Sequence, residues 1–133
     1  MRSKPPERFT IFLDESLDSD SIARALREAG AEVERLTAHF PKGTSDEQWL
    51  ALAGSRGWVV LTRDKRIRYR KLERLALMAA GVRAFVFTGG NVTLSETAAI
   101  LARSVPRMRQ LCSREPGPFI YHVGVAGKPR RMD

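Results

Sequence analysis

The chain has 133 residues, enough for one domain with a single hydrophobic core and too few for two. Its hydrophobic and charged fractions are those of an ordinary globular protein, and no apolar run approaches the ~20 residues of a membrane-spanning helix. A formal net charge of +8 favours a polyanionic partner such as a nucleic acid. The single cysteine excludes an intramolecular disulfide, and since no signal peptide is recognisable either, we expect a soluble, cytoplasmic protein.

Strands and helices are predicted to alternate along the chain. Short runs rich in β-branched and aromatic residues predict five strands, at residues 9–13, 31–36, 58–61, 82–87 and 119–125. Apolar residues at helical spacing predict four helices, over residues 16–29, from residue 44 to Gly54 or Gly57, over 69–80 and over 93–112. Pro106 should kink or divide the last of these helices.

This alternation is typical of the α/β class, and we expect a single three-layer domain over residues 1–133. Its mainly parallel central sheet should have about four or five strands, in the order 2-1-3-4 plus an edge strand, with helices on both faces. We expect the last strand at an edge of the sheet, where it runs either parallel or antiparallel to its neighbour. The core is expected over residues 8–126, with residues 1–7 and 127–133 as flexible tails.

Acidic residues follow two of the predicted strands. Asp14 ends the first strand and Asp64 lies just beyond the third, and the predicted strand order brings these two strand ends together. Asp46, in the first turn of the second helix, reaches the same rim if its loop folds back. Three converging carboxylates would suit Mg²⁺ or Mn²⁺ and metal-assisted phosphodiester hydrolysis. Glu15 and Glu47, their neighbours in sequence, are alternative ligands, candidates for orienting the attacking water, or merely solvated.

A basic segment surrounds the third of these acids. Six of the nine residues from Arg63 to Lys71 are Lys or Arg. We place the first four in a loop at the rim, where a phosphate backbone would pass, and the last two at a helix start, where the helix dipole disfavours cations. The segment therefore predicts an RNA contact, with a solvated basic face as the alternative. The nucleic-acid-binding candidates are Arg63, Lys65, Arg66, Arg68 and Arg70.

Three ordered blocks of sequence resemble one known family. Residues 12–17 (Phe-Leu-Asp-Glu-Ser-Leu), residues 44–50 (Thr-Ser-Asp-Glu-Gln-Trp-Leu) and residues 58–65 (Trp-Val-Val-Leu-Thr-Arg-Asp-Lys) are similar to the signature blocks of compact PIN-like domains. The similarity spans residues 9–125 and is closest to the VapC-like toxin branch, related to the Mut7-C group.

The resemblance implies an endoribonuclease that uses Mg²⁺ or Mn²⁺, often as the toxin of a toxin–antitoxin pair. By position, Asp14, Asp46 and Asp64 match the metal-binding acids of the family. The expected partners are RNA, an antitoxin protein and a second copy of the chain in a homodimer, with no membrane.

Two positions depart from the family pattern. Arg66 stands where larger PIN domains often carry a further acid, and Ser16 stands where many compact relatives have Asn. These departures leave a second interpretation open, a catalytically weak or inactive module that binds RNA or protein. A third is a receiver-like phosphoacceptor, in which Asp64 and Thr88 would take the conserved roles, although the last strand lacks the expected Lys.

Overall fold

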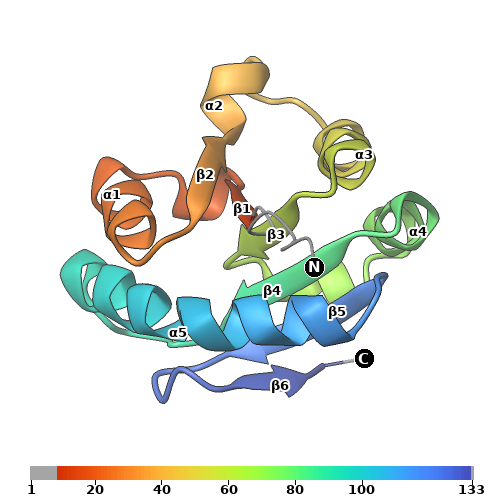
Figure 1. The fold of residues 1–133 in the computed structure, drawn as a ribbon. Coiled ribbons are helices and arrows are strands. Elements are labelled where there is room, and N and C mark those ends of the chain that lie inside the picture. Colours follow the sequence, from red (N-terminus) through yellow and green to blue (C-terminus); the bar gives the residue numbers. More distant parts are fainter. Residues whose placement is uncertain (1–8, 133) are drawn as a thin grey trace, which may run out of the picture.

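A six-stranded sheet forms the centre of the protein in the computed structural model, which describes residues 9–132 (Figure 1). The strand order is β2-β1-β3-β4-β5-β6. Strands β1 to β5 run parallel to one another, and β6 pairs antiparallel with β5. The strands are β1 (Thr10–Leu13), β2 (Glu32–Arg35), β3 (Val59–Thr62), β4 (Arg83–Phe87), β5 (Phe119–Val123) and β6 (Pro129–Arg131).

Helices cover both faces of this sheet. The α-helices are α1 (Asp20–Glu28), α2 (Leu36–His39), α3 (Asp46–Arg56), α4 (Lys71–Ala80) and α5 (Leu94–Arg114). Two 3₁₀ turns, η1 (Glu15–Leu17) and η2 (Lys65–Arg68), follow β1 and β3. In Figure 1, α1 lies beside α5 and α3 lies beside α4, and each pair is in contact. Within residues 9–132, no helix is both long and apolar enough to cross a membrane.

Strand side chains alternate between two hydrophobic cores, one on each face of the sheet. Ile11 and Leu13 of β1 point into the core beneath α1 and α5, whereas Phe12 points into the core beneath α3 and α4. There Phe12 stacks on Trp49 and Trp58, with ring centroids 5.6 and 5.7 Å away. The three layers expected from the alternation of strands and helices are therefore present.

The α/β class, the mainly parallel sheet and the order 2-1-3-4 are confirmed, but the end of the chain differs from expectation. The strand predicted at residues 119–125 is parallel to β4 and lies inside the sheet rather than at its edge. The edge is β6, in a segment expected to be a flexible tail, where Val123 pairs with Pro129 and Tyr121 with Arg131. The tail predicted at residues 1–7 lies outside the described residues.

Three local predictions also need correction. The helix expected over residues 16–29 is split into η1 and α1, because Ser19 adopts an extended backbone and caps α1 through the N–H of Ile22. The short helix α2 is not among the four predicted helices, and it begins inside the strand predicted at residues 31–36. Pro106 lies within a single helix, α5, and does not divide it.

The carboxyl ends of β1 and β3 position the candidate site. Leu13 pairs with Leu61, so the next residues, Asp14 and Thr62, lie at the same rim of the sheet. The side chain of Asp14 caps η1, and that of Asp64 caps η2. Each carboxylate is therefore held where the chain leaves its strand.

Candidate active site

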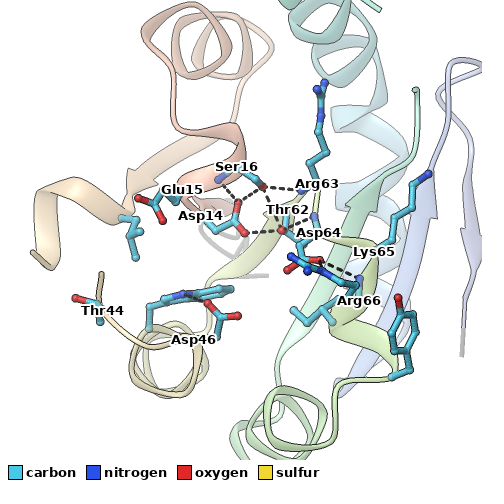
Figure 2. A pocket seen from close by; sticks show the side chains of 14 residues that line it. Asp14, Glu15, Ser16, Thr44, Asp46, Thr62, Arg63, Asp64, Lys65 and Arg66 are labelled. Carbon is cyan, nitrogen blue, oxygen red and sulfur yellow. Dashed lines mark hydrogen bonds and ion pairs between the residues drawn. The ribbon is translucent and has the colours of Figure 1, made fainter. Parts of the chain in front are cut away.

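A cavity of about 570 Å³ opens at the carboxyl ends of β1 and β3 (Figure 2). Its walls come from both strand ends, both 3₁₀ turns and the start of α3, so residues far apart in sequence meet there. The lining residues are Asp14, Glu15, Ser16, Leu36, Thr44, Asp46, Trp49, Thr62, Arg63, Asp64, Lys65, Arg66, Ile67 and Tyr69. The three aspartates predicted to be metal ligands all belong to this set.

Asp14 is buried, and both of its carboxylate oxygens accept hydrogen bonds. Its Oδ1 accepts hydrogen bonds from the backbone N–H and the hydroxyl of Ser16, at 3.1 and 2.5 Å, and its Oδ2 accepts one from the hydroxyl of Thr62. Only 7% of Asp14 is exposed, and this burial raises its pKa to about 6, against the lowering effect of these hydrogen bonds. The charged form of Asp14 is therefore costly in the absence of a cation.

The hydroxyl of Thr62 links the two strand ends. It donates to Asp14 and at the same time accepts a hydrogen bond from the backbone N–H of Asp64, at 3.0 Å. Ser16 reinforces the link, because its hydroxyl accepts from the backbone N–H of Arg63 at 2.8 Å. Thr62 is fully buried, so these hydrogen bonds hold the carboxylate of Asp14 and the backbone of Asp64 in place.

Asp46 lies across the cavity in the first turn of α3 (Figure 2). Its Oδ1 accepts a hydrogen bond from the indole N–H of Trp49 at 3.0 Å. Partial burial raises the pKa of Asp46, and the negative charges of Glu73, Asp64 and Glu47 raise it further. The loop before α3 thus does fold back to the rim, as the sequence-based hypothesis required.

Asp64 differs from the other two aspartates in having a basic partner. Both the backbone N–H and the Nε of Arg66 donate to its Oδ1, each at 3.0 Å. Partial burial acts to raise the pKa of Asp64, but the hydrogen bonds and charge of Arg66 outweigh it and lower the pKa below its ordinary value. Asp64 is therefore ionised, and the guanidinium of Arg66 compensates its negative charge.

Two of the basic residues at the rim point away from these carboxylates in Figure 2. Arg63 extends toward α5, where its guanidinium donates to the hydroxyl of Thr97 at 3.0 Å and lies 5.3 Å from the ring centroid of Phe87. Lys65 lines the cavity and extends outward from Asp64. The side chain of Arg63 is therefore held by α5 and β4.

Three other predicted residues do not line this cavity. The guanidinium of Arg68 lies 5.9 Å from the ring centroid of Tyr69, and Arg70 lies 3.9 Å from the carboxylate of Glu73. Glu47 lines a separate hollow between α3 and α4. Of the two glutamates considered, the structure brings only Glu15 into the cavity.

Two contributors were missed by sequence reasoning. Thr62 follows the strand predicted at residues 58–61 and has no predicted role in the site, because its bridging hydroxyl depends on a strand register that periodicity does not define. Glu73, in the first turn of α4, is close enough to Asp46 to raise its pKa. An acid at the start of a helix that follows a rim loop is the same signal that identified Asp46, and it could have been applied here.

The carboxylates are not drawn together into a closed ligand set. Among residues 9–132, no group of three or more His, Cys, Asp or Glu side chains is arranged to hold a metal ion. The three aspartates face one cavity from different walls, and Asp64 is turned toward Arg66.

Comparison with known proteins gives two matches. Residues 9–89 match the family model described as "PIN like domain". Over 117 residues the chain is 30% identical to a protein of Mycobacterium tuberculosis (strain ATCC 25618 / H37Rv) named "Putative ribonuclease VapC45", and the alignment covers 85% of this chain and 84% of that protein. No solved structure matches the chain.

Proposed function

Since the chain belongs to the PIN-like domain family, we propose that it is a metal-dependent endoribonuclease that hydrolyses RNA phosphodiester bonds as the toxin of a toxin–antitoxin pair. One observation carries this proposal: Asp14, Asp46 and Asp64 line a single cavity where parallel strands end. The relative from M. tuberculosis, whose name contains the word ribonuclease, supports RNA as the substrate. The net charge of +8 supports a polyanionic substrate as well.

The donors in the cavity fit a divalent cation with oxygen ligands, and we propose Mg²⁺ or Mn²⁺. Asp14 and Asp46 have raised pKa values, and within residues 9–132 no basic side chain forms an ion pair with either. Asp14 and Asp64 would hold the cation, and Asp46 would complete or orient its shell. When bound, the cation would supply Lewis-acid stabilisation of the charge that develops on the phosphate.

The residues of the chain itself bind and orient the reactants. Lys65 and Arg66 line the cavity and attract the RNA backbone. Glu15 lines the same cavity and would orient the attacking water. Thr62 keeps Asp14 fixed, so that its carboxylate presents one geometry to its ligands.

The test is cleavage of a labelled single-stranded RNA in Mn²⁺ or Mg²⁺, with and without a chelator. We expect the wild type to cleave, and Asp14→Asn and Asp64→Asn to lose at least ~100-fold in rate, because each removes a ligand charge. Glu28→Gln is the matched control, since Glu28 is an exposed acid on α1 that does not line the cavity. Cleavage that survives chelation, or that is equal in wild type and both Asp variants, would refute the site assignment.

A second candidate function is RNA binding without turnover. The observation that favours it is the ion pair between Asp64 and Arg66, which occupies one of the proposed ligands. Salt-dependent RNA binding in the absence of divalent metal, with no cleavage products in its presence, would establish this alternative. A receiver-like phosphoacceptor is set aside, because the matching family model is that of a PIN-like domain.

We also propose an antitoxin protein as a partner and the cytoplasm as the location. Three large side chains on and just before α4 are more than half exposed: Tyr69, Leu72 and Leu75. Apolar surface of this kind is typical of a protein interface, and a second copy of the chain is the alternative occupant. Light scattering of the purified protein, alone and with the product of the neighbouring gene, distinguishes the homodimer from the antitoxin complex.

A further inference from the structure

Arg66 is a basic residue that contacts one of the three aspartates, Asp64, through two hydrogen bonds. Its backbone N–H and its Nε both donate to the same atom, Oδ1 of Asp64, each at 3.0 Å. A carboxylate oxygen has two lone-pair sites, so these hydrogen bonds fill Oδ1. A cation that approaches Asp64 therefore finds only Oδ2 available unless the guanidinium leaves.

The charge of Arg66 acts on the rest of the cavity as well. Besides pairing with Asp64, it interacts electrostatically with Asp46 on the opposite wall. Arg66 thus brings one positive charge close to two of the three aspartates. A divalent cation in the same cavity would be repelled by this charge and would compete with it for Asp64.

The contact is one that can be exchanged. The side chain of Arg66 is 56% exposed and that of Asp64 is 26% exposed, and ion pairs with this exposure are weak. Arg66 differs in this from Arg63, which is held by Thr97 and Phe87. A guanidinium also matches the geometry of a phosphate with two parallel hydrogen bonds, as it does that of a carboxylate.

We propose that Arg66 is an exchangeable counter-ion: it occupies Asp64 while the cavity holds no divalent cation, and it moves to the RNA phosphate when a cation binds. This inference rests on the proposed function, because it assumes that the cavity binds both a divalent cation and RNA. It assigns Arg66 two successive partners, and it explains how a basic residue can stand where larger relatives carry an acid without abolishing metal binding. Metal and RNA then favour each other's binding, since each removes a competitor of the other.

Calorimetric titration with Mn²⁺ alone tests the competition. Arg66→Gln should bind Mn²⁺ roughly three- to tenfold more tightly than the wild type, because a repelling charge and a competing donor are gone. Arg68→Gln is the matched control: it removes the same charge from the same 3₁₀ turn, but Arg68 has its guanidinium over Tyr69. Its Mn²⁺ affinity should stay within about twofold of the wild type.

Binding of a fluorescent single-stranded RNA, measured in Ca²⁺ and in chelator, tests whether Arg66 moves to the RNA phosphate. Arg66→Gln should weaken RNA binding more in Ca²⁺ than in chelator, because only the cation-bound protein has Arg66 free for phosphate. If the wild type binds Mn²⁺ and Arg66→Gln binds it equally or less tightly, Arg66 positions Asp64 and the exchange is refuted while the proposed function stands. If neither protein binds Mn²⁺, both are refuted. If only Arg66→Gln binds Mn²⁺, Arg66 excludes the cation from the cavity instead of exchanging with it, and the exchange is refuted.

Discussion

Replacing Asp14 with asparagine is expected to stabilise the protein at neutral pH while abolishing RNA cleavage. In the folded chain the pKa of Asp14 is raised from 3.8 to about 6, so folding favours the protonated carboxyl. The stability that this group contributes is fully present below pH 3.8 and is lost as the pH rises through about 6. The difference between these pKa values corresponds to about 3 kcal/mol of destabilisation at pH 7 and above.

The asparagine variant removes this cost because it carries no charge at any pH. The hydroxyl of Thr62, which donates to Asp14, can turn to accept from the new amide, and Ser16 can still donate to the amide oxygen. Allowing for a less favourable hydrogen bond, we expect a gain of about 1–3 kcal/mol at pH 7.5, or roughly 3–12 °C in Tm for a chain of this size. The gain should vanish near pH 4.

Urea denaturation at pH 4 and pH 7.5, in chelator, measures this effect, with cleavage assayed in parallel. Asp64→Asn serves as the control, because the pKa of Asp64 is shifted in the opposite direction, downward, by Arg66. Its charge therefore stabilises the fold above pH 3.8, and removing that charge should bring no gain in stability. A stability of Asp14→Asn that equals or falls below that of the wild type at pH 7.5, or a gain that is independent of pH, would show that burial of the Asp14 charge has been misjudged.

Three further predictions concern the fold and the substrate. Thr62→Val should cost about 1–3 kcal/mol of unfolding free energy in urea denaturation and slow RNA cleavage, because Asp14 loses a buried hydrogen-bond donor. Thr62→Ser keeps the hydroxyl and should retain both the stability and the cleavage rate. Gly54→Ala should also cost about 1–3 kcal/mol by urea denaturation, since the new Cβ would clash with the carbonyl oxygen of Ala80. An unchanged midpoint would contradict the close packing of α3 on α4. RNA affinity measured in chelator should fall linearly on a log–log plot against salt, with a slope of about −0.7 for each phosphate neutralised, and an affinity independent of salt would exclude a phosphate contact.

The sequence was sufficient for the strand order and for the convergence of the three aspartates. Both follow from the alternation of buried strands and amphipathic helices, since parallel strands end at one rim and Asp14 and Asp64 follow two of them. The position of Asp46 depended on one condition, the return of the loop before α3 to the rim, and the structure meets that condition.

Other features depend on tertiary contacts that no local pattern records. Strand β6 is three residues long and basic, and it forms because β5 offers a free edge, as in the hydrogen bond from the backbone N–H of Met132 to the carbonyl of Ile120. The partners of Arg63 and Arg66 were equally hidden. Both lie in one basic run, yet one is held on α5 and the other on Asp64. Their separation is decided by side-chain geometry, which composition does not contain.

The tryptophans give the protein an intrinsic optical reporter of its own cavity. Both indoles of the chain stack on Phe12, and the indole N–H of Trp49 is hydrogen-bonded to Asp46 at 3.0 Å. A change in the charge near Asp46 alters the electric field at this indole, and so its emission. Occupancy of the cavity by a cation or a nucleotide should therefore be readable as intrinsic fluorescence, without a label, and a Trp58→Phe variant would leave Trp49 as the single source of the signal.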